Sequence, residues 1–352
     1  MKNNKSFTLI ELLVVIVIIG ILAGVIAIST SNNIAKAQDS KVSSTMLGIN
    51  KLLKTYSMDT FPIEATPCNI KTSCTNLKSK IDVPNIDQDI YYKTSSSGNF
   101  FVIYANKPSD TSLSFEINSN IEKIKEVPSF DNLVAYYPLS IGTSDGNTIS
   151  DMSPNSNNGT NNGATFSEGV DGNMNSAMKF DGNDDYISIP HATSIGPPPS
   201  FTFITWIKIN ILEGNYRHFA DKWVNSSPRN GFYLAYRGPL AEANEGKINF
   251  QVYNNDSGKG LTSNSVLETG KWYMIAATIN TNQMTLEIWD KNKRIERKIG
   301  SGITIGEEKR KALTLGAQAY NYGQCNAILT GIRLYNKALS ESEITILYNN
   351  DL

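Results

Sequence analysis

Three acidic residues lie close together in one short stretch and could bind a cation. Asp181, Asp184 and Asp185 fall in the sequence Asp-Gly-Asn-Asp-Asp, between two stretches that alternate apolar and polar residues. Carboxylate oxygens are the hard ligands that Ca²⁺ prefers. The same composition is typical of the tight polar turn of a β-hairpin, here predicted over residues 177–190. The sequence is compatible with calcium binding at these three residues and with a plain hairpin turn.

Residue types that perform catalysis are sparse and scattered. The chain has two histidines, His191 and His218, and neither accompanies a Gly-x-Ser-x-Gly or a Cys/His arrangement. Glu287 and Asp290 come nearest to the carboxylate pair of a glycosidase, but their spacing puts them on opposite faces of one strand. We therefore expect no enzyme and no required cofactor, with both histidines as surface or packing residues.

Aromatic side chains could instead stack against sugar rings. Trp223 precedes a polar loop and is the tryptophan expected to be exposed, while Tyr320 and Tyr322 form a second candidate surface. These three residues are the candidate ligand-binding residues. The other tryptophans stand in apolar strand patterns and are expected in the core: Trp206, Trp272 and Trp289.

The three cysteines cannot all pair with one another. Cys68 and Cys74 are close enough in sequence to close a small disulfide loop in an oxidising compartment, which leaves Cys325 over. Two unrelated thiols are the alternative reading.

Composition limits the class of partner. The formal net charge is −1 over 352 residues, so no basic field favours nucleic acid. Charged residues are only 18% of the chain, and Asn, Ser, Thr, Gly and Tyr replace them, as is common in extracellular β-rich domains. The length allows two domains.

The N-terminus combines a short polar leader with a long apolar run. Residues 7–28 read FTLIELLVVIVIIGILAGVIAI, with Glu11 as the single charge. About 20 apolar residues can cross a bilayer as a helix, and Lys2 and Lys5 before it favour a positive-inside orientation. A carboxylate in such a helix is costly and usually has a partner. Gly20 and Gly24 form a G-x-x-x-G that lets helix backbones approach closely.

These N-terminal residues resemble the prepilin peptidase site of type IV pilins: Ser6 followed by Phe7-Thr8-Leu9-Ile10-Glu11. The resemblance implies cleavage between Ser6 and Phe7, N-methylation of Phe7, and pairing of Glu11 with that amine on a neighbouring subunit. It implies a subunit anchored in the membrane before assembly and extracellular in a pilus afterwards. Its partners would be other pilins, the prepilin peptidase and the assembly machinery. An ordinary signal peptide, cleaved after Ala37, and a plain membrane anchor are the alternatives.

The next segment continues with helical and then strand periodicity. Val42, Met46, Ile49, Leu53 and Tyr56 form one apolar stripe on a polar helix. Residues 89–93, 98–105 and 113–117 read as three short strands, which could cover that stripe. A long helix, an irregular loop and an antiparallel sheet resemble a small pilin head.

The remainder contains many short strands. Alternating patterns occur at residues 133–139, 201–209, 232–236, 247–253, 272–279 and 284–289, which is typical of a sandwich or jelly roll. Ser340 and Glu343 form the capping box of a terminal helical turn.

This region resembles the laminin-G-like, concanavalin-type jelly roll, over about residues 131–350. The matching pieces, in the order of the family, are residues 133–139, 178–186, 201–207, 272–276 and 331–340. The resemblance implies non-catalytic binding of carbohydrate or protein, often with calcium. Relatives often carry acidic residues where this chain has Thr330 and Gly331, so that support for a metal is missing here.

The sequence therefore predicts an α+β pilin module followed by an all-β jelly-roll sandwich. Its function would be that of a minor type IV pilin that displays a lectin-like adhesion module for a surface glycan or protein. A major pilin with a decorating sandwich, and a pseudopilin of a secretion or DNA-uptake machine, are the alternatives. The predicted segments are a leader at 1–6, a membrane and filament-core segment at 7–28, a pilin module at 7–127, a linker at 128–132 and a jelly roll at 133–352.

Overall fold

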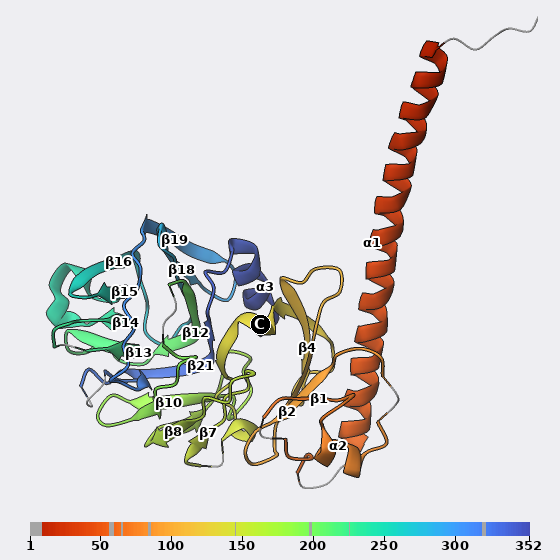
Figure 1. Ribbon diagram of the computed structural model, residues 1–352. Helices are drawn as coiled ribbons and strands as arrows, with labels where there is room; N and C mark the ends of the chain where they lie inside the picture. The colour runs from red at the N-terminus through yellow and green to blue at the C-terminus, as the bar shows by residue number, and fades with distance from the viewer. Residues whose placement is uncertain are drawn as a thin grey trace, which may run out of the picture.

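The computed structural model describes most of the chain (Figure 1). Its backbone is described over residues 9–55, 60–64, 66–83, 86–144, 146–196, 199–224, 226–318 and 322–352. Side chains are described in these ranges from residue 30 onward, except 241–243. The processing residues Ser6 and Phe7, the side chains of Glu11, Gly20 and Gly24, and Tyr320 lie outside the described residues.

One long helix, α1 (Leu9–Thr55), leads into the rest of the molecule. Four residues of the predicted stripe, Val42, Met46, Ile49 and Leu53, are at most 3% exposed and pack against a small sheet. Among side chains that the structure describes, no helix is long and apolar enough to cross a membrane. The apolar run predicted to do so, residues 7–28, lies outside them.

The small sheet is antiparallel and has the strand order β1-β2-β3-β4-β5. The predicted strands correspond to its three central members, and its two edge strands were not predicted. Cys68 and Cys74 are joined by a disulfide with an S–S distance of 1.99 Å, and Cys325 is free and buried. The elements are β1 (Cys68–Asn69), α2 (Thr75–Lys80), β2 (Tyr91–Thr94), β3 (Phe101–Asn106), β4 (Leu113–Asn118) and β5 (Lys125–Pro128).

Two larger antiparallel sheets pack face to face as a sandwich, the jelly-roll architecture that the sequence predicts. The sheet nearer the small sheet, here the proximal sheet, has the order β19-β18-β17-β12-β21-β10-β9, with β6 also paired to β21. Its strands are β6 (Leu133–Tyr137), β9 (Thr165–Ser167), β10 (Ala177–Asp181), β12 (Phe201–Ile209), β17 (Trp272–Ile279), β18 (Gln283–Trp289), β19 (Arg294–Ser301) and β21 (Asn326–Tyr335).

The second sheet, here the distal sheet, has the order β16-β15-β14-β13-β20-β11-β8-β7, and β13 to β16 lie on the side away from α1 (Figure 1). Its strands are β7 (Thr148–Ile149), β8 (Gly159–Asn162), β11 (Tyr186–Ile189), β13 (Tyr216–Trp223), β14 (Gly231–Arg237), β15 (Lys247–Asn254), β16 (Ser257–Val266) and β20 (Leu313–Leu315). Short 3-10 helices occur at Phe130–Asn132, Ile141–Thr143 and Pro239–Asn244.

The proximal sheet is apolar on both faces. In β17, Tyr273, Ile275 and Ala277 point into the core between the two sheets. The alternate residues Met274 and Ala276 belong to a second cluster on the other face. That face must be covered, because exposed apolar surface of this extent is unfavourable in water.

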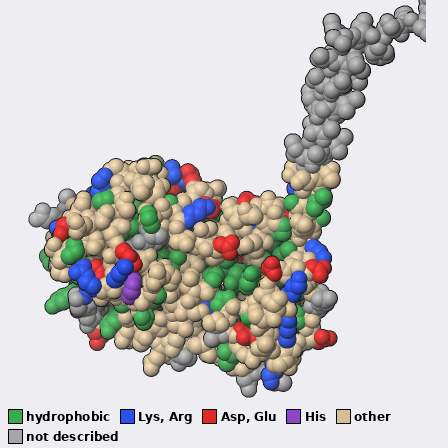
Figure 2. Space-filling view, viewed as in Figure 1, with side chains coloured by type: hydrophobic (Ala, Val, Ile, Leu, Met, Phe, Trp, Pro, Cys, Tyr) green, Lys and Arg blue, Asp and Glu red, His purple; other side chains and the backbone are tan. Residues whose placement is uncertain are grey.

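Helix α3 and the small sheet provide this cover. Helix α3 (Glu341–Asp351) lies between the sandwich and the small sheet (Figure 1), begins at the predicted Ser340–Glu343 capping box, and stacks Tyr348 on Trp206 at 5.9 Å. From the small sheet, Val102 and Tyr104 join the same cluster. Figure 2 shows one continuous body with hydrophobic side chains gathered where the two parts meet.

The predicted linker at 128–132 is packed rather than extended between domains. Pro128 ends β5, and residues 130–132 form a 3-10 helix capped by Ser129. Phe130 is 1% exposed, and its ring stacks on Tyr104 at 4.2 Å. These residues lie between β5 of the small sheet and β6 of the proximal sheet, and Val127, Phe130 and Leu133 pack in the second cluster.

Charged groups are buried in the same junction. Arg333 donates to both oxygens of Asp351, at 2.8 and 3.0 Å, and its guanidinium lies 4.5 Å from the ring centre of Tyr136. Removing one partner of a buried pair leaves an uncompensated charge. Burial also raises the pKa of Glu116, which lies on β4 of the small sheet.

Asp351→Ala should therefore destabilise the small sheet and the sandwich together. We expect a loss of about 3–5 kcal/mol in the free energy of unfolding, because Arg333 loses its buried partner. Glu268→Ala, which breaks an exposed pair with Lys271, is the control and should change little. Urea unfolding followed by tryptophan fluorescence and by proteolysis of the small sheet measures both parts. A small effect of Asp351→Ala, or loss of the small sheet alone, would contradict the shared junction.

Burial of Lys93 makes the free energy of unfolding depend on pH. This residue of β2 is 1% exposed, donates to Ser153 O at 2.6 Å across the junction, and has its pKa lowered by burial to about 8. Between pH 8 and 10.5 the unfolded chain binds this proton more strongly than the folded one, so Lys93 makes stability rise with pH in that window. The measurement is the free energy of unfolding across that window for wild type and Lys93→Met.

The rise should be smaller in Lys93→Met. Lys222, whose pKa burial also lowers to about 8, is present in both proteins and cancels in the difference. Parallel curves for the two proteins would show that Lys93 is not buried with a lowered pKa.

Candidate functional site

The outer face of the distal sheet carries a row of aromatic side chains. Alternation in β14 directs Phe232, Leu234 and Tyr236 into the core and leaves Tyr233 and Arg237 on the outer face. The same alternation in β13 and β15 brings three further rings to this face. We call the four rings the aromatic row: Tyr216, Tyr233, Trp223 and Tyr253.

The rings of the aromatic row are in contact from one end to the other. The Tyr233 ring centre lies 6.2 Å from that of Tyr216 and 5.6 Å from that of Trp223. Trp223 in turn stacks on Tyr253 at 5.4 Å. These separations are within the usual range for interacting aromatic pairs. The row therefore forms one platform across three strands.

Small residues of β14 lie in register with residues of the two neighbouring strands on this face. Gly231 pairs in register with Trp223 and Tyr253, and Ala235 with His218 and Asn249. Gly231 has a φ of +98°, and a Cβ there would overlap the Lys222 carbonyl oxygen. A larger residue at this position would both strain the backbone and disturb the platform.

An arginine lies over each terminal tyrosine of the row. The Arg237 guanidinium lies 4.8 Å from the ring centre of Tyr216, and that of Arg229 lies 5.4 Å from Tyr253. Arg229 is paired with Asp256 at 3.1 Å. No carboxylate within the described part of the chain pairs with Arg237.

Three buried polar atoms on this face have no hydrogen-bond partner among the residues that the structure describes: Trp223 Nε1, Arg237 Nε and Asn249 Oδ1. A buried polar group left unsatisfied costs about 1–3 kcal/mol. Each of these atoms is shielded from solvent.

A histidine and an aspartate lie beside the row. His218 Nδ1 is 3.0 Å from Asp221 Oδ2, and the His218 ring centre is 5.0 Å from that of Tyr233. Both residues are buried, at 4% and 0% exposure. His191 lies in the connection between β11 and β12, and its Nδ1 is 3.3 Å from Lys222 Nζ. Burial lowers the pKa of His191. Burial of His218 agrees with a packing role.

The sequence prediction for Trp223 was wrong about its exposure. Trp223 is 9% exposed, because its indole packs against the rings of Tyr233 and Tyr253. Tyr322 is 69% exposed, in a loop whose Gly323 carbonyl oxygen accepts a hydrogen bond from His218 N at 2.8 Å. That loop therefore borders the aromatic row. Tyr320, in the same loop, lies outside the described residues.

The acidic triplet is not a hairpin turn. Asp181 ends β10 in the proximal sheet, and Asp185 precedes β11 in the distal sheet, so the turn carries the chain between sheets. The apolar residues of both strands face the same core from opposite sides, which explains the hairpin-like alternation.

The carboxylate oxygens of Asp181, Asp184 and Asp185 lie within 4.8 Å of one another. They are close enough to share a cation, but two of them already hold the turn. Asp181 accepts from Asn183 N and Nδ2, which lowers its pKa, and Asp185 Oδ2 accepts from Asp181 N at 2.9 Å.

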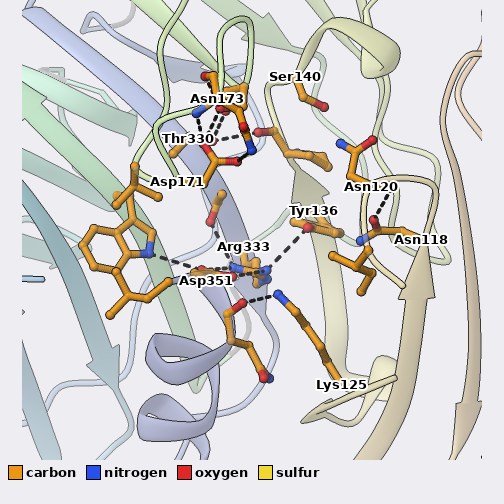
Figure 3. Close-up of a pocket in the computed structure, with 18 of the residues that line it drawn as sticks. Asn118, Asn120, Lys125, Tyr136, Ser140, Asp171, Asn173, Thr330, Arg333 and Asp351 are labelled. Carbon is orange, nitrogen blue, oxygen red and sulfur yellow. Dashed lines mark hydrogen bonds and ion pairs between the residues drawn. The ribbon is translucent and has the colours of Figure 1, made fainter. Parts of the chain in front are cut away.

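A polar pocket of about 280 Å³ lies between the small sheet, α3 and the sandwich. Figure 3 shows Arg333 and Asp351 at its centre, with Tyr136 beside them and Lys125 below. Thr330 Oγ1 donates to Ser176 O at 2.8 Å, and Lys125 Nζ donates to Asn350 O. Because these groups already bind one another, the pocket belongs to the junction, and the aromatic row is the better candidate for a ligand.

Sequence reasoning missed most of the row. Only Trp223 was singled out, although the alternation at 232–236 and 247–253 would have placed Tyr233 and Tyr253 on outward positions. The neighbouring order of β13, β14 and β15, which brings the rings together, was not available from the sequence.

Comparison with known proteins agrees with both sequence resemblances. Residues 1–27 match the model of the prokaryotic N-terminal methylation motif. Residues 181–345 match the model of the concanavalin A-like lectin/glucanases superfamily, a shorter span than the resemblance at 131–350. No curated protein matches the chain.

Several solved structures are similar to part of this chain at low identity. The binding domain of Paraclostridial mosquitocidal protein 1 is 19% identical, with a TM-score of 0.49, over 63% of this chain and 52% of that one. The binding domain of botulinum neurotoxin serotype D is 16% identical, with a TM-score of 0.46, over 63% and 51%. Trypanosoma rangeli sialidase is 16% identical, with a TM-score of 0.44, over 61% and 32%.

The chain thus spans about half the length of these toxin binding domains and about a third of the sialidase. The family models and the fold lead to one assignment. This protein carries a type IV pilin-like N-terminal methylation motif, and its C-terminal part is a laminin G-like, concanavalin A-like domain.

Proposed function

We propose that this protein is a minor type IV pilin that displays its sandwich as an adhesion module for a surface glycan or protein. The observation that carries the proposal is the aromatic row on the distal sheet. Because the small sheet and α3 cover the proximal sheet, the row lies on the opposite side of the sandwich from the pilin module. The binding is non-catalytic in this proposal.

The N-terminal motif supports the filament part of the proposal. Prepilin peptidase would cleave between Ser6 and Phe7, and Glu11 would pair with the new amine of a neighbouring subunit. Gly20 and Gly24 would let the helices pack closely in the filament core. The partners are then other pilins and the assembly machinery, with the membrane as the location before assembly.

The size of the sandwich favours a sparse or tip position. Residues 133–352 form a domain larger than the pilin module at 7–127, and one copy on every subunit would crowd a filament. A major pilin would be abundant in sheared filaments, and a pseudopilin would engage cargo in a secretion or DNA-uptake machine. Quantifying the protein relative to other pilins in sheared filaments separates the first two readings.

Tyr233→Ala should weaken adhesion of filaments without preventing their assembly. Tyr233 joins the two halves of the aromatic row, and removing a central aromatic residue from an interface typically costs about 2 kcal/mol, roughly 30-fold in affinity. The measurement is binding of sheared filaments to host-cell or matrix glycoprotein surfaces, at equal filament mass.

Tyr91→Ala is the matched control. Tyr91 also stacks on a second tyrosine, Tyr104 at 5.2 Å, but lies on the small sheet. Thermal unfolding of each variant shows whether it is folded. If Tyr233→Ala filaments adhere as well as wild type, the aromatic row does not bind the surface. If Tyr91→Ala filaments lose as much adhesion as Tyr233→Ala filaments, the loss is not specific to the aromatic row.

A further inference from the structure

We propose that the aromatic row selects glycans that carry a negative charge, and that Arg237 binds the anionic group. The inference rests on the proposed function and names the ligand class for that face. The ligand would place a sugar ring against Tyr233 and a carboxylate or sulfate against the Arg237 guanidinium.

Arg237 is held at the end of the row. It pairs in register with Tyr216, and Arg237 Nη2 donates to the Tyr216 hydroxyl while the guanidinium lies over the ring. Two contacts with one side chain orient the planar group across the sheet. A guanidinium that is already oriented loses less conformational entropy when it binds an anion.

The charge of Arg237 is not neutralised by any carboxylate in the described ranges, which distinguishes it from Arg229. Both arginines lie over a tyrosine, but Arg229 donates to Asp256 from its backbone nitrogen and from Nε. Asp221, beside the aromatic row, is 0% exposed and lies against His218. The face therefore offers a guanidinium that no carboxylate of the described residues neutralises, next to the half-buried tyrosines of the aromatic row.

Three unsatisfied polar atoms lie beneath the same face. Arg237 Nε and Trp223 Nε1 are donors, and Asn249 Oδ1 is an acceptor, each buried with no partner within the part of the chain that the structure describes. A carboxylate or sulfate accepts charge-assisted hydrogen bonds from arginine, and sugar hydroxyls both donate and accept.

The test uses the full-length protein in detergent on a glycan array that holds each backbone in carboxylated, sulfated and neutral forms, with polyglutamate as an acidic peptide. Wild type should bind at least one anionic form about ten- to hundred-fold more tightly than its neutral counterpart, the range expected for hydrogen bonds to a charged group. The carboxylated and sulfated members show which anion is preferred. Binding should weaken as salt is raised.

Arg237→Met should abolish the preference for the charged form, and Arg237→Gln provides a second variant if Met disturbs the fold. Arg229→Met is the matched control, and its ratio of charged to neutral binding should equal that of wild type. A preference that survives in both Arg237 variants overturns the inference, as does binding of polyglutamate without any glycan.

The outcomes separate the two proposals. Equal binding of neutral and charged forms, with loss of both in Tyr233→Ala, would overturn the charge selection and leave the adhesion proposal standing. Failure of wild type to bind any member, together with adhesion unaffected by Tyr233→Ala, would overturn both.

Discussion

The proximal sheet has two apolar faces, and the rest of the molecule is arranged to cover them. One face packs against the distal sheet in the core of the sandwich, and the other requires α3 and the small sheet. At about 25 cal/mol per Å² of buried apolar surface, leaving the second face in water would be strongly unfavourable. The sandwich is therefore joined to the helix-bearing part through a shared core, and the distal sheet is the layer whose outer face stays free of it.

Polar groups in the junction allow few alternative arrangements. Arg333, Asp351, Glu116 and Lys93 are all at most about one-eighth exposed, with side chains or carbonyl groups from the opposite part close by. A shift between the two parts would separate Lys93 from Ser153 O, its partner across the junction, at a cost of several kcal/mol for a buried charge. The aromatic row consequently keeps one orientation relative to α1, which suits a module that must present a binding face away from its support.

Local periodicity predicted much of this structure, and contacts between distant segments account for most of what it missed. The stripe from Val42 to Leu53 and the bounds of β12 and β17 follow from alternation within one element. The stretch around Asp181 alternates like a hairpin, yet its two strands join different sheets, because both sheets face the same core. Trp223 was expected to be exposed, and it is buried by aromatic rings that come from neighbouring strands. The aromatic row itself depends on strand order, which alternation does not specify.

A pilin that displays an adhesion module must be processed at its N-terminus and reach the surface in filaments. Mass spectrometry of the mature N-terminus, taken separately from membrane and sheared-filament fractions, tests that requirement most directly. We expect the protein in the sheared fraction to begin at an N-methylated Phe7. An N-terminus at Gln38 would indicate cleavage of an ordinary signal peptide, and it would contradict the account by leaving a secreted lectin-like protein with no filament.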